Sequence, residues 1–177
     1  MDVVMWRRLW HRLHEVDTHL TERLHVPTDH PARLLVVLGA HLGDGPLWLI
    51  LWGIGLWYWR GEPRLFTGLL KWVGSAMLAA VVTYTIKFVV RRSRPREVGG
   101  FYSQKYDVHA FPSGHATRMG TVAWWGSVLF PQWAPVFWGV SMWCIFSRAA
   151  VGVHYLGDVI AGFLVGMGVS FGVWLIL

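Results

Sequence analysis

The sequence predicts an all-α fold: a multi-span transmembrane helical bundle of about five spans, with an additional N-terminal surface helix. Three observations lead to this prediction. Of the 177 residues, 54% are hydrophobic and only 15% are charged, whereas a soluble domain carries about a quarter charged residues. Several apolar runs reach the roughly 20 residues that a helix needs to cross hydrocarbon. The 13 tryptophans are typical of helix ends that lie among lipid headgroups.

Residues 1–33 are predicted to form an N-terminal amphipathic interfacial segment, and residues 34–177 the membrane domain. Within the first segment, residues 1–25 combine apolar side chains on one side of a helix with arginines and histidines on the other. No apolar run there is long enough to cross a bilayer, so the helix is expected to lie on the membrane surface. Basic residues also interrupt the apolar core that a signal peptide requires, and we therefore expect none.

The apolar stretch from Leu34 to Trp59 is interrupted by Gly43-Asp44-Gly45-Pro46. It forms either one kinked helix or a short surface helix followed by a brief span that begins near Pro46, and we favour the second arrangement. Aspartate directly before a helix start is a common N-cap, and proline is common in the first turn. Asp44 could be a buried functional carboxylate, but the sequence favours the capping role.

Four further spans follow, at about residues 66–90, 113–130, 135–150 and 156–177. Turns are predicted at residues 60–64 and at Pro131, and one long polar connection covers residues 91–112. Glycine recurs along the last span, at positions 162, 166, 168 and 172. Small residues of this kind let neighbouring membrane helices approach closely, and we expect all four to do so.

Polar residues are concentrated in three clusters, each at the end or the start of a predicted span. The clusters are Lys87 with Arg94-Pro95, Pro112-Ser113-Gly114-His115, and Ser147-Arg148 with His154 and Asp158. When the membrane crossings are counted, all three clusters fall on the same side of the bilayer. The bundle would therefore bring cations, imidazoles, a carboxylate and a hydroxyl together at one end.

His154 and Asp158 are four residues apart, so a helix that begins just before His154 places both on one face. A carboxylate that accepts from one imidazole nitrogen fixes the tautomer and makes the other nitrogen a better nucleophile or base. Arg148 would reach the same pocket from the preceding helix end. In the plainer alternative, Arg148 anchors its helix at the headgroups and His154 only caps, but the other clusters favour the pocket.

The segment from Ser113 to His115 opens a predicted helix, whose free backbone N–H groups form an anion site. A helix start alone does not explain a histidine in the first turn of a span, and His115 is well placed to protonate a leaving oxygen. Lys87 and Arg94 are interpreted as a phosphate clamp, although a lysine near a span end often only extends its amine to the interface. Three neighbouring arginines are expected to act only as anchors: Arg91, Arg92 and Arg96.

This three-part pattern resembles the signature of the type 2 phosphatidic acid phosphatase (PAP2) family, in its integral-membrane lipid phosphatase branch. Every signature position is filled: Lys87 and Arg94-Pro95, then Pro112-Ser113-Gly114-His115, then Ser147-Arg148, His154 and Asp158. The match covers the chain from about residue 44 to its end. It implies the helical core that this family shares with vanadium haloperoxidases and bacterial acid phosphatases. Membrane relatives usually carry six spans, and here the surface helix takes the place of the first.

The resemblance implies a metal-independent phosphohydrolase that works through a phosphohistidine. His154 would attack phosphorus, oriented by Asp158, and His115 would protonate the leaving oxygen before water releases phosphate. The phosphate oxygens would be held by Lys87, Arg94, Ser113, Gly114 and Arg148. Phosphoryl transfer depends mostly on positioning and charge stabilisation, which these groups would supply. No cofactor or metal ion is expected, because no acidic cluster in the sequence offers a magnesium site.

The expected partners are membrane lipids and a substrate that is a lipid phosphate or a polyprenyl or lipid diphosphate. The formal charge of +6 is assigned to anionic lipid and not to nucleic acid, because basic residues flank apolar spans and no nucleic-acid motif is present. A loop over residues 99–109 is expected to cover the pocket. Its Lys105 and His109 could contact a second phosphate, but solvated positions are favoured. Cys144, the only cysteine, offers neither a disulfide nor a cysteine metal site.

The protein is expected in the cell membrane, either inner or plasma. The family places its active face outside the cytoplasm, whereas basic residues on the motif side would make that side cytoplasmic under the positive-inside rule. We favour the orientation of the family. Two rival functions are a lipid phosphotransferase of the same fold and a small anion transporter that uses the cationic cluster as a binding site. A transporter does not need the spacing of His154 and Asp158, which therefore favours an enzyme.

Overall fold

The computed structural model describes residues 3–96 and 107–177, and the regular elements within these ranges are all helices. They are α1 (Val3–Leu24), α2 (Arg33–His41), α3 (Gly45–Tyr58), α4 (Pro63–Val90), α5 (Gly114–Leu129), α6 (Ala134–Ala150) and α7 (Leu156–Ile176), with a 3-10 turn at Pro131–Trp133. The predicted all-α fold is confirmed. The last four predicted spans correspond to α4, α5, α6 and α7.

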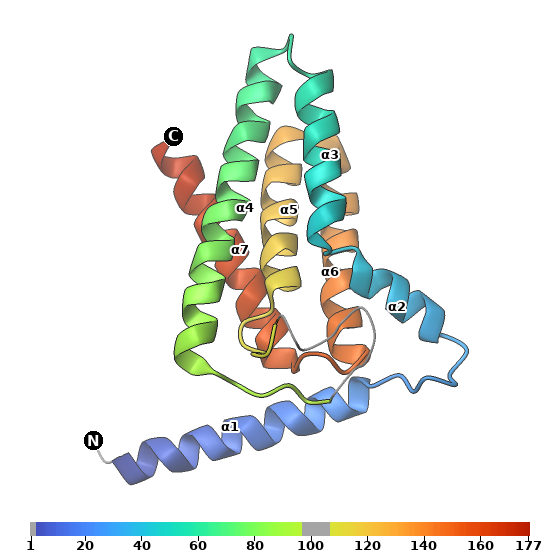
Figure 1. The fold of residues 1–177 in the computed structure, drawn as a ribbon, viewed down its shortest axis with the longest axis vertical. Helices are drawn as coiled ribbons and strands as arrows, with labels where there is room; N and C mark the ends of the chain where they lie inside the picture. The colour runs from blue at the N-terminus through green and yellow to red at the C-terminus, as the bar shows by residue number, and fades with distance from the viewer. Residues whose placement is uncertain (1–2, 97–106) are drawn as a thin grey trace.

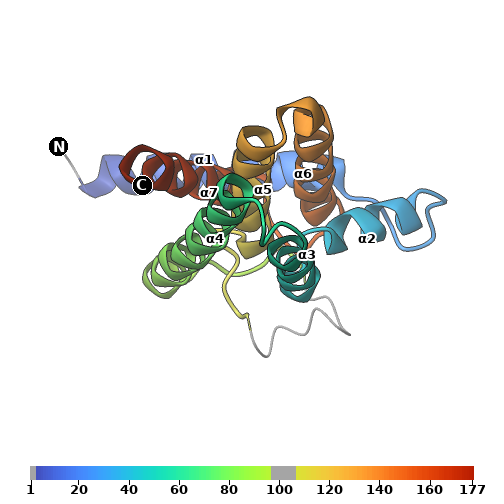
Figure 2. The ribbon, with the colours of Figure 1, turned by 90° about the horizontal axis from the view of Figure 1, so that it is seen from above.

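Helices α3 to α7 run together as a bundle with α5 inside it (Figures 1 and 2). α5 packs against α4, α6 and α7. α4 and α6 end, and α5 and α7 begin, at the same end of the bundle, which is the lower end in Figure 1. The prediction that the three polar clusters meet at one end is therefore confirmed.

Two helices in the described ranges, α4 and α7, are long and apolar enough to cross a membrane. α2 and α3 meet the same condition as a pair, with a bend of 55° at the break between them. α5 and α6 lie alongside the longer helices but have 16 and 17 residues. At about 1.5 Å per residue they are somewhat shorter than the ~30 Å hydrocarbon core. The prediction of five spans is thus met by α4 and α7 and stays a prediction for the other three.

The predicted interruption of the first apolar stretch separates α2 from α3, so the break into two helices is confirmed, whereas a surface position for α2 with a span in α3 alone stays a prediction. α3 begins at Gly45 and has Pro46 in its first turn, where the missing N–H of proline costs nothing. Asp44 occupies the N-cap position but makes no side-chain capping bond. The expected capping role is therefore wrong, because the Asp44 carboxylate binds two histidines instead.

Glycines bring α7 so close to α5 that a side chain would collide. A Cβ at Gly162 or Gly166 would meet a backbone carbonyl oxygen at the start of α5. The expectation of close helix approach is confirmed for these two positions. It is wrong for Gly168 and Gly172, around which there is open space. The close contact is thus confined to the half of α7 that begins at the polar clusters.

Several tryptophans lie in the core of the bundle and not among headgroups. Trp48, Trp52 and Trp72 contact one another at ring-centre separations of 5.8–6.0 Å. Trp125 on α5 is fully buried and donates its indole N–H to the Ser75 hydroxyl at 2.9 Å, which satisfies a group that needs an acceptor when buried. The headgroup expectation is wrong for these four tryptophans, which fill the space between α3, α4 and α5.

α1 lies across the end of the bundle where the clusters meet (Figure 1). The backbone N–H of Gly157 donates to Asp17 Oδ1 at 2.8 Å, and that of Leu156 donates to Thr21 Oγ1 at 3.0 Å. Both are among the N–H groups at the start of α7 that have no partner within the helix, so α1 caps α7. Apolar side chains elsewhere on α1 remain about half exposed, as a helix on a bilayer surface requires: Met5, Leu9, Leu13, Val16 and Leu20.

Candidate active site

The ends of four helices bring residues of all three polar clusters together in a candidate active site. Lys87 lies in the last turn of α4, His115 in the first turn of α5, and Arg148 in the last turn of α6. Arg94 follows α4, and His154 lies between α6 and α7. Lys87, Arg148 and His154 are at most 3% exposed. Because an interfacial anchor keeps its charge among water or headgroups, this burial excludes a plain anchoring role for Lys87 and Arg148.

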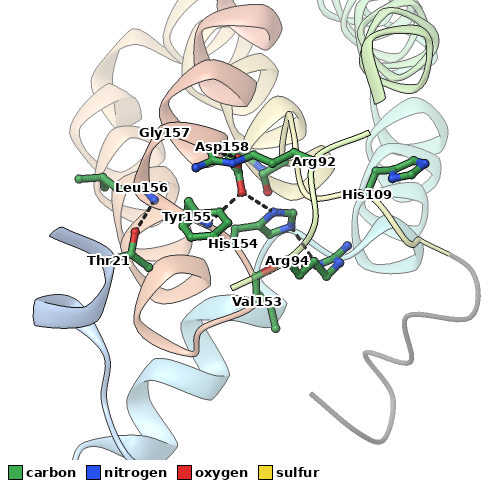
Figure 3. A network of polar contacts seen from close by, with 12 residues as sticks. Thr21, Arg92, Arg94, His109, Val153, His154, Tyr155, Leu156, Gly157 and Asp158 are labelled. Carbon is green, nitrogen blue, oxygen red and sulfur yellow. Dashed lines mark hydrogen bonds and ion pairs between the residues drawn. The ribbon is translucent and has the colours of Figure 1, made fainter. Parts of the chain in front are cut away.

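His154 is surrounded by cations. Its Nε2 lies 3.4 Å from Arg94 Nη1, and its Nδ1 faces Asp158 Oδ2 at 3.6 Å (Figure 3). The pKa of the imidazole is lowered well below its ordinary 6.5, first by burial and then by the charges of Arg148, Arg94, Lys87 and His115. The ring is therefore neutral at neutral pH, which is the form that can act as a nucleophile.

Asp158 is fully buried at the start of α7, and its carboxylate is shared among several groups. Oδ2 accepts from the backbone N–H of Tyr155 at 2.9 Å, and Oδ1 accepts from Arg92 Nη1 at 2.7 Å. The 3.6 Å to His154 Nδ1 is an ion-pair separation that is longer than a hydrogen bond. The predicted proximity of His154 and Asp158 is confirmed, but the predicted common helix face is wrong, because α7 begins only at Leu156. The carboxylate is also not dedicated to the histidine.

Arg92 is not a membrane anchor, so the interpretation from the sequence is wrong for this residue. Its guanidinium bridges Asp158 Oδ1 and Asp17 Oδ2, with 2.7 Å to each (Figure 3 shows the Asp158 side). It also lies over the ring of Tyr155, 4.0 Å from the ring centre. The chain turns toward α7 because Arg91 adopts a left-handed backbone conformation, with φ of 49°. Since Asp17 belongs to α1, the bridge connects the N-terminal helix to the carboxylate beside His154.

Lys87 and Arg94 hold a carboxylate between them. Lys87 Nζ lies 2.9 Å from Asp107 Oδ1, and Arg94 Nη2 lies 3.0 Å from Asp107 Oδ2. Lys87 also donates to the carbonyl oxygen of His109 at 2.5 Å, and Arg94 to that of Val153 at 2.9 Å. Two carboxylate oxygens in these positions bind the cations as two phosphate oxygens would. Asp107 therefore occupies the place where the predicted clamp would hold a phosphate.

Ser113 and Gly114 begin α5 beside a cavity of about 250 Å³. Ser113 Oγ accepts from the backbone N–H of Ala116 at 3.5 Å, so the predicted helix start is confirmed. N–H groups in the first turn of a helix have no partner within that helix and are available to an anion. The cavity lining combines Gly114 and the polar Lys87, Asp107 and His115 with α4 side chains: Ala76, Ala80 and Tyr84.

A carboxylate from the connection between α2 and α3 contacts His115. Asp44 Oδ1 lies 2.7 Å from His115 Nε2, and Asp44 Oδ2 lies 2.7 Å from His41 Nδ1. The contacts therefore favour a functional carboxylate over a helix cap at this position. Arg118, one turn after His115 on α5, donates to the carbonyl oxygen of Gly43 and holds the connection against α5.

Four charged residues at or beside the site are not assigned to it by the sequence interpretation: Asp17, Asp44, Arg92 and Asp107. Asp44 is considered there as a functional carboxylate, but the capping role is favoured. Two of them have a feature in the sequence that could have identified them: Asp44 is an acid inside an apolar stretch, and Arg92 is a second arginine two positions before Arg94. The other two acids lie 75 and 20 residues from their partners, and no local pattern marks them. Within the predicted loop, Lys105 lies outside the described residues, and His109 contributes its backbone carbonyl to Lys87.

Comparison with known proteins identifies the family. Residues 68–177, more than half of the chain, match the PAP2 superfamily. The chain belongs to this superfamily. It is 32% identical over 117 residues to a lipid A 1-phosphatase of Rhizobium etli, covering 59% of this chain and 48% of the relative. It is 34% identical over 101 residues to an undecaprenyl-diphosphatase of Sulfolobus acidocaldarius, covering 55% and 49%. The chain thus spans about half the length of these curated relatives.

Two solved structures share the fold. A PAP2-type phosphatidylglycerolphosphate phosphatase from Bacillus subtilis superposes with a TM-score of 0.71 at 19% identity, covering 92% of this chain and 85% of that chain. LpxE from Aquifex aeolicus superposes with a TM-score of 0.69 at 20% identity, covering 88% and 93%. Together with the apolar helices α4 and α7, the family makes this an integral membrane protein, as predicted.

Proposed function

We propose that this protein removes phosphate from a lipid phosphate, or from a polyprenyl or lipid diphosphate, through a phosphohistidine intermediate. The observation that carries the proposal is the position of His154. Its Nε2 lies 3.4 Å from Arg94, and its buried, neutral ring is under the electrostatic influence of Arg148, Lys87 and His115. A neutral nucleophile among fixed cations suits attack on a phosphate dianion. The names of the two curated relatives, both phosphatases of lipids, support the same reaction.

In the first step, His154 Nε2 forms a bond to phosphorus while the bond from phosphorus to the leaving oxygen breaks. His115 gives a proton to that oxygen, so the lipid departs as an alcohol or, from a diphosphate, as a lipid phosphate. Asp158 stabilises the positive charge that develops on the phosphorylated imidazole. In the second step, neutral His115 takes a proton from water as the water oxygen attacks phosphorus. The bond to His154 then breaks, and inorganic phosphate leaves.

The remaining residues of the site hold the phosphate oxygens. Lys87, Arg94 and Arg148 supply positive charge, and Ser113 with the Gly114 N–H supplies hydrogen bonds at the start of α5. A single fixed donor of this kind typically contributes about 3 kcal/mol to the transition state. Asp107 must leave Lys87 and Arg94 before the phosphate can take its place, because both clamp residues already bind its carboxylate.

A lipid substrate fits the cavity better than a water-soluble phosphate. The same cavity that contains Lys87 and His115 is lined by Ala76, Ala80 and Tyr84 of the apolar helix α4. Neighbouring α4 residues such as Met77 and Val81 are more than 60% exposed, as side chains facing lipid would be. A headgroup can therefore enter the polar part of the cavity while its hydrocarbon chain stays in the bilayer.

The decisive experiment is capture of the intermediate. We expect wild-type protein in lipid nanodiscs, mixed rapidly with a ³²P-labelled lipid phosphate, to carry transient label that is stable in base and labile in acid. His154→Ala should carry no label and lose at least about a thousandfold in turnover, while its thermal unfolding stays close to wild type. The exposed His30→Ala serves as a matched control and should keep full activity. Normal turnover by His154→Ala would refute the proposal.

The proposal includes the location of the site. We place the protein in the cell membrane, with residues 1–33 as an interfacial segment, residues 34–177 as the membrane domain and the active face outside the cytoplasm. Two single-cysteine variants test this orientation. Val108→Cys places a thiol at the site, and Gly61→Cys places one in the turn at the opposite end of the bundle; both positions are exposed. A membrane-impermeant thiol reagent on intact cells should label only the first. The reverse pattern would place the active face in the cytoplasm.

A further inference from the structure

The connection between α2 and α3 packs directly onto the histidine that acts as the proton donor. Gly43 lies against His115: a Cβ at Gly43 would be 2.9 Å from His115 Cβ, too close for any side chain without a shift of α5. The carbonyl oxygen of Gly43 accepts from Arg118, which is one turn further along α5. The 55° bend between α2 and α3 thus occurs where the chain is fixed against the start of α5.

Asp44, the next residue, is held at both carboxylate oxygens. Oδ1 lies 2.7 Å from His115 Nε2, across 71 residues of sequence, and Oδ2 lies 2.7 Å from His41 Nδ1. The side chains of Asp44 and His115 are only 26% and 24% exposed. Neither oxygen caps α3, although the residue stands at its N-cap position. The carboxylate is therefore committed to the two imidazoles and not to its own helix.

We propose that Asp44 is a positioning residue for the proton donor His115, and that His41 holds Asp44 in place. The inference rests on the proposed function, because it concerns the acid of that reaction. Asp44 accepts the hydrogen bond from His115 Nε2–H, and the proton that the leaving oxygen receives comes from His115 Nδ1. A carboxylate at this distance fixes the ring and stabilises the charge of the imidazolium.

The same contact serves both steps of the reaction. His115 loses the Nδ1 proton when the lipid oxygen departs and regains one at Nδ1 from the attacking water. The Nε2–H stays with Asp44 throughout, so the ring does not rotate between the steps. A proton donor held within a few tenths of an ångström in this way is the arrangement that general acid catalysis requires.

Dependence on the leaving group separates this role from a structural one. The two probes are dodecyl phosphate, whose alkoxide must be protonated to leave, and a 2-nitrophenyl phosphate that carries the same alkyl chain on its ring, whose phenolate leaves without a proton. We expect Asp44→Asn to lower kcat/KM for dodecyl phosphate by roughly 30- to 100-fold, within the range of general acid catalysis. The nitrophenyl substrate should lose less than about threefold, because a fixed proton donor contributes little to it.

Two further variants keep the test sharp if Asp44→Asn folds poorly. Asp44→Glu retains a carboxylate and should recover part of the activity on dodecyl phosphate. His41→Gln keeps Asp44 but weakens the contact that holds its carboxylate. It should lower kcat/KM by less than Asp44→Asn does, with the same dependence on the leaving group. The exposed Asp29→Asn, in the loop before α2, is the matched control for removal of a carboxylate and should behave as wild type with both probes.

Each outcome has a defined meaning. A selective loss on dodecyl phosphate in Asp44→Asn, with recovery in Asp44→Glu, supports the positioning role. Equal losses on both probes, or no loss on either, would overturn it while the proposed function stands, because wild type still turns over both substrates. Failure of wild type to release phosphate from either probe would instead overturn the proposed function, and this inference with it.

Discussion

Each of the two histidines at the site has a carboxylate beside it, but the chain forms the two pairs in different ways. His154 and Asp158 are four residues apart, and their nearest polar atoms are 3.6 Å apart. His115 and Asp44 are 71 residues apart, and their nearest polar atoms are 2.7 Å apart. The pair that is close in sequence is the looser one in space. Proximity along the chain therefore identifies a neighbour, whereas packing decides which carboxylate is bound directly.

The difference agrees with what the two rings must do in the proposed reaction. The nucleophile has to be neutral, and His154 lies among cations, with Asp158 drawn away by Arg92 and Tyr155. The proton donor has to carry a charge, and His115 has a carboxylate at hydrogen-bond distance. The two arrangements of the same pair of side-chain types thus give the rings different surroundings, with cations around His154 and a carboxylate bound directly to His115.

The largest effect among the remaining tests should come from Asp158→Asn, which removes the carboxylate beside the nucleophile His154. We expect kcat to fall roughly a hundredfold, because His154 loses the negative charge that stabilises its phosphorylated form and Arg92 loses a buried partner. The loss should be the same for dodecyl and nitrophenyl substrates, in contrast to Asp44→Asn, because formation of the bond to phosphorus is impaired. Rapid-quench measurement of phosphoenzyme formation with both substrates tests this prediction.

Asp17→Asn is the matched control for the Asp158 experiment. It removes the α1 end of the Arg92 bridge but leaves Asp158 in place, so the expected loss is less than about tenfold, as for a partly exposed ion pair. If the Asp158→Asn defect were confined to the dodecyl substrate, Asp158 and Asp44 would both support protonation of the leaving group. The proposed difference between the two histidine–carboxylate pairs would then be wrong.

The same contrast explains which features of the protein could be predicted from its sequence. The helix start at Ser113 and the proximity of His154 to Asp158 depend on spacings of a few residues, although His154 lies just before α7, which begins at Leu156. The meeting of the clusters at one end of the bundle follows from the order of the apolar spans. All of these needed only local pattern and a count of crossings, and the fold confirms them.

The contacts that could not be predicted depend on tertiary packing. Asp44 reaches His115 because it lies in the break between α2 and α3, where the two helices meet at 55°, and because Arg118 holds this connection on α5. Arg92 reaches Asp158 because α4 ends at Arg91, whose left-handed conformation turns the chain away from the helix axis. An acid directly before a helix start is more often a cap, and an arginine after a span more often an anchor, so the sequence favours the common role in each case.

A smaller effect is expected in the titration of the His154 imidazole, which tests whether the nucleophile is neutral. Because burial and the neighbouring cations lower the pKa of His154 well below 6.5, the ring should stay neutral at pH 6.5 and become protonated only as pH falls through the lowered value. Formation of the phosphoenzyme should therefore persist below pH 6.5. ¹⁵N-histidine NMR, with His154→Gln to assign the signal, measures the titration directly.

Arg94→Gln is the companion variant for that titration. It removes one of the positive charges that lower the pKa of His154, so the midpoint should move upward, toward the ordinary value. The movement should be partial, because burial is the larger cause and remains. A midpoint at or above 6.5 in the wild-type protein would contradict a neutral nucleophile that is held in that state by its surroundings.

The smallest expected effect concerns Asp107, a third carboxylate that contacts neither histidine but binds Lys87 and Arg94 at 2.9 and 3.0 Å. Because it competes with phosphate for both cations and is 41% exposed, its removal should strengthen anion binding only severalfold, as is typical of a partly exposed ion pair. Asp107→Asn should lower the KM of dodecyl phosphate and the inhibition constant of orthovanadate together, with kcat little changed. Asp29→Asn should change neither constant. Weaker vanadate binding in Asp107→Asn would show that this carboxylate holds the clamp together and does not compete with phosphate, and the site would then depend on three carboxylates and not on two.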